Sequence, residues 1–321
     1  LHKLLYRSVR RPDGTYTHIP KTEIPYRVLV IDEISMVPRE MIELLNKMKR
    51  VYVICLGDPF QLPPISKNQD NHLLDKPHIF LDEIMRQALD SEIIELSMRI
   101  REGKKIEPFI GKEVQIYAAN DLSTGMLTWA DQVLVATNKK RKVINNYVRE
   151  LLGFEGGPQD GDKVISLKND WDVLNSSGSA LVNGTIGWLS NSYNTYTNVP
   201  YYYCNEYFDK SQFRVLRADV KDETDSVFEN LSLDKDMIET GLRCCDSRTE
   251  ARIGANKKDS WILPKQFEYG YAITVHRAQG SEWNNILVVE EKFPFEKTEH
   301  ARWLYTACTR ASERLVLILK E

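Results

Sequence analysis

Residues 26–33 read Tyr-Arg-Val-Leu-Val-Ile-Asp-Glu, a short apolar run rich in β-branched side chains that stops at two acids. Such a run predicts a buried parallel strand. A helix is expected from Pro38 to Arg50, and residues 51–56 form a second apolar run that stops at Gly57-Asp58-Pro59. Strand, helix and strand make a βαβ unit, so we expect an α/β layer with a parallel sheet.

Two further features flank this unit. Residues 5–25 hold a Pro12-Asp13-Gly14 turn between polar, β-prone flanks, which predicts a projecting β-hairpin. Residues 89–103 have a helical pattern, and this first block of sequence ends at Gly103 or Pro108.

The rest of the chain repeats the α/β pattern and interrupts it once. A strand, a helix and a strand over residues 132–167 start a second set. Residues 185–262 alternate short β-prone runs with polar, acidic spacers, which predicts an antiparallel insert. Helix and strand alternate again from Tyr269 and end in a strand over residues 314–319.

Composition sets the limits of these expectations. The chain has 321 residues, which suits two domains, and 42% hydrophobic residues, which is too rich for disorder. Its net charge of −3 gives no global basic field, so nucleic-acid binding would depend on local placement of Lys and Arg. No apolar stretch approaches the roughly 20 residues of a membrane span. Five scattered cysteines without a Cys-x-x-Cys pair argue against a disulfide scaffold or a zinc site and favour a reducing cytoplasm.

The acidic pair after the first strand is the first candidate for chemistry. An apolar strand that ends in Asp-Glu has the Walker B arrangement, in which Asp32 could hold Mg²⁺ and Glu33 could deprotonate a water molecule. The alternative is an acidic strand end that faces solvent.

The loop after the second strand is the next candidate. Residues 57–64 read Gly-Asp-Pro-Phe-Gln-Leu-Pro-Pro and follow a strand's carboxyl end, where parallel sheets build ligand sites. A proline-rich turn explains the Gly and Pro residues but not Gln61, whose neutral amide could contact a γ-phosphate.

These segments and three later ones resemble the ordered motifs of superfamily 1 helicases, most closely the RecD and phage Dda branch called superfamily 1B. VIDEISM (30–36) resembles motif II and LGDPFQLPP (56–64) motif III. MRQA (85–88) resembles motif IV, ITVHRAQGSEW (273–283) motif V, and LYTACTRA (304–311) motif VI. Motifs in this order are highly specific. The resemblance runs from about His2 to the C-terminus and leaves only residues 190–260 without a recognisable pattern.

The resemblance implies roles for residues that match the motifs. Asp32 would bind Mg²⁺, Glu33 would act as general base, and Gln61 would sense the γ-phosphate. Arg86 and Arg310 would clamp the transferring phosphoryl group, because a guanidinium stabilises the charge on its oxygens. An ordinary surface ion pair is the alternative for each arginine.

Motif V would contribute to the nucleotide site as well. Glu282 matches a position that approaches the nucleotide sugar, while Gln279 and Gly280 match positions that couple nucleotide to DNA.

Contacts to single-stranded DNA are also implied by resemblance, from small polar groups that touch phosphates: Thr137, Asn138, Thr274 and His276. A histidine buried in the interior is the alternative for His276. Residues 139–142 form a basic helix face that could be merely solvated or could tether phosphates. The tyrosines at 201–203, with Tyr207 and Phe208, could stack on bases or bury alternate rings in a strand of the insert.

One motif of the family is missing from the sequence. A P-loop needs Gly-x-x-x-x-Gly-Lys-Ser/Thr, and the Gly-Lys pairs at Gly103 and Gly111 lack both the leading Gly and the trailing hydroxyl. We expect a Gly-x-x-Gly-x-Gly-Lys-Thr-like loop to be encoded upstream of Leu1, and this chain alone to hydrolyse almost no ATP.

The resulting prediction is an α/β protein with two RecA-like P-loop NTPase domains. The first, residues 1–115, would be truncated at its N-terminus and would carry a pin hairpin at about 5–25. The second would comprise 116–184 and 263–321, with a β-rich, SH3-like insert over 185–262.

The implied function is an ATP-dependent DNA helicase of 5′→3′ polarity in the cytoplasm of a bacterial or phage-infected cell. ATP and Mg²⁺ would be its cofactors. Single-stranded DNA, a duplex fork and other replication, recombination or repair proteins would be its partners, with no membrane involved. Two alternatives stay open: a translocating subunit of a helicase–nuclease complex, and a non-enzymatic nucleic-acid-binding module.

Overall fold

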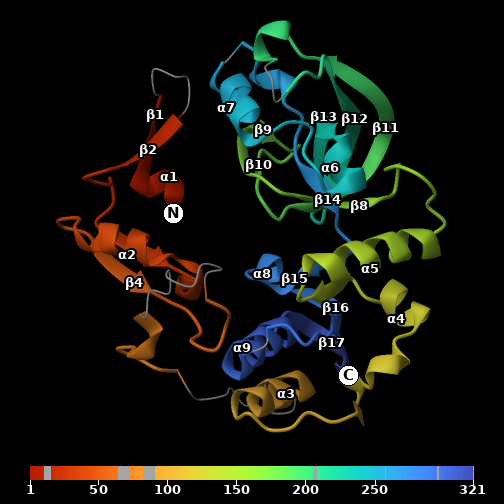
Figure 1. Cartoon of the computed structure of the whole chain (residues 1–321). Helices are drawn as coiled ribbons and strands as arrows, with labels where there is room; N and C mark the ends of the chain where they lie inside the picture. The colour runs from red at the N-terminus through yellow and green to blue at the C-terminus, as the bar shows by residue number, and fades with distance from the viewer. Residues whose placement is uncertain are drawn as a thin grey trace. The chain divides into compact units, whose positions relative to one another are not determined.

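The computed structural model describes residues 1–10, 16–63, 73–81, 91–204, 208–256, 258–294 and 296–320 (Figure 1). No helix in these ranges is long and apolar enough to cross a bilayer. The chain forms two compact units: residues 1–7, 19–144 and 272–321 make the first, and residues 8–18 and 145–271 make the second. The first unit thus contains strands expected for both RecA-like domains, and the domain boundaries expected from the sequence stay predictions.

The first unit begins with the βαβ unit expected from the sequence. Strands β3 (Val28–Ile31) and β4 (Tyr52–Cys55) pair in parallel, with helix α2 (Arg39–Asn46) between them. One side of this two-stranded sheet packs on a core with α2 and the short helix α1 (His2–Leu5).

The other side of the same sheet is exposed, which corrects the expectation of two buried strands. Both strands are predicted to be buried, yet the residues Val28 and Val30 are 57% exposed, and Tyr52 and Ile54 are 74% and 50% exposed. The apolar run encodes a strand correctly, but no described part of the chain covers this side of it.

A six-stranded sheet forms the rest of the first unit, in the order β15-β7-β16-β17-β6-β5. Its strands are parallel except β5, which pairs antiparallel with β6. The parallel pairing confirms the α/β class. The strands are β5 (Phe109–Ile110), β6 (Val114–Tyr117), β7 (Gln132–Val135), β15 (Ala272–Thr274), β16 (Trp283–Val289) and β17 (Ala311–Ile318).

Helices accompany this sheet at the positions where the sequence alternates. Helix α3 packs against α9, and α9 leads directly into β17. In order along the chain they are α3 (Glu92–Arg101), α4 (Thr124–Trp129), α5 (Asn138–Leu151), α8 (Val275–Ala278) and α9 (Lys297–Cys308).

The second unit is built on a five-stranded antiparallel sheet in the order β13-β12-β11-β8-β14. The antiparallel insert expected over 185–262 is present as β11 (Ile186–Asn198), β12 (Gln212–Asp222) and β13 (Val227–Asp234). Strands β8 (Lys163–Ser166) and β14 (Phe267–Tyr269) join the same sheet. The expectation that residues 163–167 continue the parallel layer is therefore wrong, because β8 pairs on both edges with antiparallel partners.

Smaller elements complete this unit. The pair β9 (Asp170–Leu174) and β10 (Ala180–Leu181) is separate from the large sheet. Helices α6 (Lys235–Thr240) and α7 (Ser247–Ala255) begin at Asp234 and Asp246, whose side chains accept backbone N–H bonds as N-caps.

The tyrosine cluster differs from the expected strand. Residues 201–203 form a 3₁₀ turn in which Tyr203 is buried and Tyr201 is 86% exposed, and the hydroxyls of Tyr202 and Tyr203 both donate to Asp259. Tyr207 lies outside the described residues. The expected hairpin is present as a two-stranded sheet of β1 (Tyr6–Arg10) and β2 (Tyr16–Pro20), while its turn at 11–15 lies outside them.

Candidate functional site

The acidic pair Asp32-Glu33 sits at the carboxyl end of β3. Asp32 is exposed, and its Oδ1 accepts the N–H of Glu33 at 2.8 Å. Glu33 has a left-handed backbone, with φ of 51°, and its Oε2 is buried without a hydrogen-bond partner in the part of the chain that the structure describes. A strained non-glycine residue with an unsatisfied carboxylate is atypical of a solvated strand end and typical of a functional site.

The loop after β4 lies against this pair. The N–H of Ile34 donates to the carbonyl of Leu56 at 2.9 Å, and a Cβ at Gly57 would lie 2.9 Å from the Ile34 side chain. Only glycine fits this close approach without a shift. The turn that follows is fixed by Asp58, whose Oδ1 accepts the N–H of Phe60 at 2.9 Å.

Gln61 is the residue of this turn with an unsatisfied group. Its Oε1 is buried and makes no hydrogen bond within the described ranges. An amide held in this state is available to an incoming ligand, as the prediction for Gln61 requires.

Residues from the motif V and VI segments hold the same loop from the other side. The Thr306 hydroxyl accepts the N–H of Leu62 at 3.0 Å, and the Gln279 amide donates to the Leu62 carbonyl at 2.9 Å. The Tyr305 hydroxyl donates to Asp58 Oδ2 at 2.6 Å. Sequence reasoning assigned no role to Tyr305 or Thr306. The available signal was the spacing of Thr306, which lies four residues, about one helical turn, before Arg310.

Arg310 lies where α9 ends and β17 begins, and it is only 8% exposed. Its guanidinium donates to the carbonyls of Thr306 (3.1 Å) and Ser281 (3.4 Å) and to the Thr309 hydroxyl (3.3 Å). It makes no ion pair with any described residue. Burial lowers the pKa of Arg310, while the charges of Glu33, Asp58 and Glu282 act in the opposite direction. A buried cation bonded only to neutral groups is suited to an anionic ligand.

The remaining nucleotide-site candidates have mixed surroundings. Gly280 has φ of +78°, a left-handed conformation at the turn after α8, and Glu282 is exposed and close enough to act on the pKa of Arg310. Arg86 lies outside the described residues. The structure thus brings together Glu33, Gln61, Gln279 and Arg310 with Asp58.

Neither Gly-Lys pair is a phosphate cradle. Gly103 has φ of +68° and ends helix α3, where its N–H donates to the Ile100 carbonyl. The amides after Gly111 are already occupied, because Glu92 accepts the N–H groups of Lys112 (3.1 Å), Glu113 (2.8 Å) and Val114 (2.9 Å). A carboxylate of the chain itself fills that anion-binding turn.

The expected DNA-contact residues gather at one edge of the six-stranded sheet. Strands β15 and β7 pair with Thr274 opposite Val135, so Thr274 ends β15 beside the end of β7, and Thr137 follows β7. Thr137 is not free, since its hydroxyl donates to Glu291 at 2.7 Å. Asn138 is exposed at the start of α5. Burial lowers the pKa of His276, which favours the neutral form of this side chain.

Comparisons with known proteins bear on this arrangement. Residues 1–125 match the family described as AAA domain, and residues 269–318 match the UvrD-like helicase C-terminal domain. The chain is 26% identical to the ATP-dependent RecD2 DNA helicase of Deinococcus radiodurans over 98% of its own length. It is 24% identical to an uncharacterized protein of Acanthamoeba polyphaga mimivirus over 92% of its length. These matches support the resemblance of the chain to superfamily 1B helicases.

Solved Pif1 helicase structures show the same fold. The Pif1 helicase of Candida albicans has a TM-score of 0.51 at 18% identity, over 91% of this chain and 71% of that one. A Bacteroides Pif1 in complex with ADP-AlF3 and single-stranded DNA has a TM-score of 0.50 at 16% identity, over 92% and 73%. These likenesses confirm the fold with two RecA-like domains. The chain spans 75% of the mimivirus protein but 39% of RecD2.

Proposed function

We propose that the chain is the motor part of an ATP-dependent DNA helicase that moves 5′→3′ along single-stranded DNA. The observation that carries this proposal is Arg310, a buried guanidinium whose hydrogen-bond partners among the described residues are neutral and on which the charge of Glu33 acts. Glu33 and Gln61 both have an unsatisfied side-chain oxygen, and the residue after Gln61 is bonded to Thr306 of α9. The relatives named as ATP-dependent DNA helicases, and the Pif1 structure with ADP-AlF3 and single-stranded DNA, support it.

Each residue has a part in ATP hydrolysis that fits its surroundings. Glu33 accepts a proton from the attacking water, and Gln61 contacts the γ-phosphate. Arg310 stabilises the charge on the transferring phosphoryl oxygens. Leu62 is bonded on both sides to residues of motifs V and VI, so a change at Gln61 reaches α8 and α9 directly.

A magnesium ion fits this site only as part of a nucleotide complex. Asp32 supplies one exposed carboxylate, and the described residues contain no group of three metal-binding side chains. Mg²⁺ normally keeps several waters and is bound through one or two carboxylates together with substrate phosphates. Its contribution when bound is to neutralise phosphate charge.

The proposal requires a phosphate-binding loop, which the 321 residues do not contain. We propose that the gene encodes it upstream of Leu1, because a complete motif II to VI set needs a bound triphosphate to act on. The hairpin of β1 and β2 is proposed as the pin that splits a duplex at the fork.

The test uses the complete gene product. Single-stranded DNA should stimulate ATP hydrolysis, and a fork with a 5′ tail should be unwound while one with a 3′ tail is not. Glu33→Gln should keep nucleotide affinity and lose turnover, since an amide cannot accept the proton. The proposal would be refuted if single-stranded DNA did not change the rate of ATP hydrolysis, or if the gene encoded no phosphate-binding loop.

A further inference from the structure

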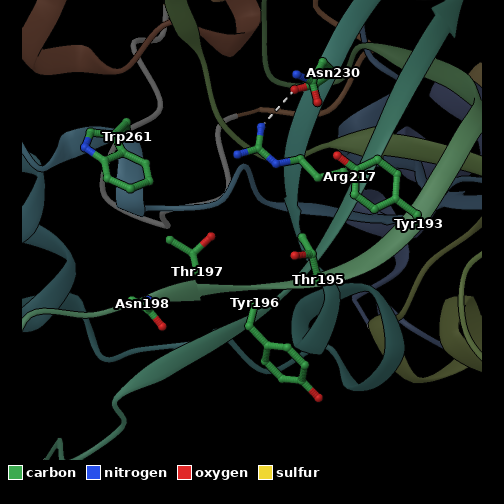
Figure 2. Close-up of a pocket in the computed structure, with 8 residues that line it drawn as sticks. All are labelled: Tyr193, Thr195, Tyr196, Thr197, Asn198, Arg217, Asn230 and Trp261. Atoms are coloured by element: carbon green, nitrogen blue, oxygen red, sulfur yellow. Dashed lines mark hydrogen bonds between the residues drawn. The ribbon is translucent and has the colours of Figure 1, made fainter.

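A groove on the antiparallel unit has a composition that the nucleotide chemistry does not explain. It has a volume of about 460 Å³ and lies beside strands β11 and β12. Figure 2 shows Trp261 and Tyr193 on opposite sides of it, with the hydroxyls of Thr195 and Thr197 between them and the guanidinium of Arg217 above.

Two aromatic rings of the groove are exposed although they belong to ordered elements, Tyr193 to β11 and Trp261 to a 3₁₀ turn over residues 260–262. Trp261 is 62% exposed and Tyr193 is 58% exposed, and neither ring stacks on another ring among the described residues. Ile262, next to Trp261, is 2% exposed and packs in a core with Phe213 and Ile253. Leaving an anchored tryptophan open to solvent forgoes the stabilisation that burial would give, which points to a ligand.

The charge of the groove selects the kind of ligand. Arg217 donates to the Asn230 carbonyl at 3.2 Å and makes no ion pair within the ranges that the structure describes. No carboxylate is among the described residues that line the groove. The nearby Asp219 is already engaged by the Asn230 N–H (2.6 Å) and the Asn191 amide (2.7 Å). The groove therefore offers a cation, two hydroxyls and two open rings to an anionic ligand.

We propose that this groove binds single-stranded nucleic acid, a second contact site in addition to the one expected at Thr137, Asn138, Thr274 and His276. Bases stack on Trp261 and Tyr193, and Arg217 contacts a phosphate. This inference rests on the proposed function, whose substrate is single-stranded DNA.

A proline-rich peptide is the other ligand for which aromatic grooves are known. Among the described residues that line the groove, Arg217 is a cation and none is a carboxylate, which favours a polyanion over such a peptide. The peptide is therefore an outcome that the experiment has to separate.

The experiment measures binding of a fluorescent oligo(dT) to the full chain by anisotropy. Trp261→Ala and Tyr193→Ala should each weaken affinity about tenfold, while Trp261→Phe keeps an aromatic ring and most of the affinity. Arg217→Gln should lower the salt slope of log K by about 0.7, the value for one phosphate on a single strand. Tyr196→Ala is the matched control: this residue borders the groove on the same strand and is 64% exposed, but its ring points to the other side of β11 in Figure 2.

The outcomes separate the two proposals. If the wild-type chain binds oligo(dT) and the Trp261→Ala and Tyr193→Ala variants bind it with the same affinity, the groove is not a nucleic-acid site. The proposed helicase function would be unaffected by that result. No binding of oligo(dT) by the wild-type chain overturns the DNA function itself. Binding of a polyproline peptide that Trp261→Ala abolishes, with oligo(dT) affinity unchanged, assigns the groove to a protein partner instead.

Discussion

At the scale of single residues, the arginine at the end of α9 is the most informative side chain. Arg310 is buried, has neutral hydrogen-bond partners and lies near three carboxylates. An arginine needed only for folding would be expected to use one of these carboxylates as a direct partner. The geometry instead leaves its charge available to a phosphate.

Replacing this residue gives the sharpest test of its role. In the complete gene product, Arg310→Ala should slow ATP hydrolysis by about 10³- to 10⁵-fold, as loss of an arginine finger does. Affinity for single-stranded DNA without nucleotide should be nearly unchanged, and so should its salt dependence. Arg314→Ala is a matched control. Arg314 lies on the exposed start of β17, and its guanidinium donates to Asn285 of β16. A collapse of DNA affinity with intact hydrolysis would instead place Arg310 at the DNA.

At the scale of elements, the loop after β4 depends on helix α9. Leu62 is 3% exposed, and its N–H has the Thr306 hydroxyl as partner. Thr306→Val keeps the shape of the side chain but leaves this N–H buried and unsatisfied. The free energy of unfolding should fall by about 1–3 kcal/mol, measured by urea denaturation.

Thr128→Val provides the comparison for that measurement. Both threonine hydroxyls donate to a carbonyl four residues earlier in their own helix, but Thr128 is exposed and accepts nothing from another element. Its replacement should change stability by less than about 0.5 kcal/mol. Equal effects of the two substitutions would show that the bond to Leu62 contributes nothing.

The carboxylate of Glu92 links α3 to the turn before β6. Hydrogen bonds from the N–H groups of Val114, Lys112 and Glu113 lower the pKa of Glu92 below its ordinary value of 4.5. Because the pKa of Glu92 is lower in the folded chain than in the unfolded chain, its carboxylate stabilises the fold fully at pH values above about 4.5. This stabilisation is lost as the pH falls through the pKa that Glu92 has in the folded chain.

Glu92→Gln therefore has a pH-dependent effect on stability. The urea midpoint of the variant should lie below that of the wild type at pH 7, and the two should converge as pH falls below about 4.5. Glu95→Gln, on the exposed side of the same helix, should leave the midpoint unchanged at both pH values. A constant difference from pH 7 to pH 3 would show that the Glu92 charge is not responsible.

At the scale of the whole molecule, one side of the β3–β4 sheet is exposed. Val28, Val30, Tyr52 and Ile54 form a contiguous exposed apolar surface on two paired strands. Such surfaces mark interaction sites or promote aggregation.

Polar substitutions on this surface should therefore improve the behaviour of the chain in solution. Val30→Thr with Ile54→Thr should raise the concentration at which the chain self-associates, measured by light scattering, and change the free energy of unfolding by less than about 0.5 kcal/mol. Leu29→Thr, on the side of β3 that packs on the core, should instead destabilise the chain. Unchanged association of the double variant would show that this surface does not mediate it.

The sequence by itself determined the local elements and the identity of the candidate catalytic residues. Apolar runs gave β3, β4 and β7, and the alternating insert gave β11 to β13, because strand and helix formation depends on short-range periodicity. Asp32, Glu33 and Gln61 stood out because they follow the carboxyl ends of apolar strands, and Arg310 was identified by its match to an ordered family motif.

The tertiary structure alone decided which of these elements meet. The bond from Leu62 to Thr306 joins residues 244 positions apart, and no local pattern encodes such a pair. The same holds for β8, which joins an antiparallel sheet, and for Trp261 facing Tyr193 across the groove. Burial also depends on the partners that cover a strand, so the run at 26–31 encodes a β-strand but cannot specify that one side of it stays exposed.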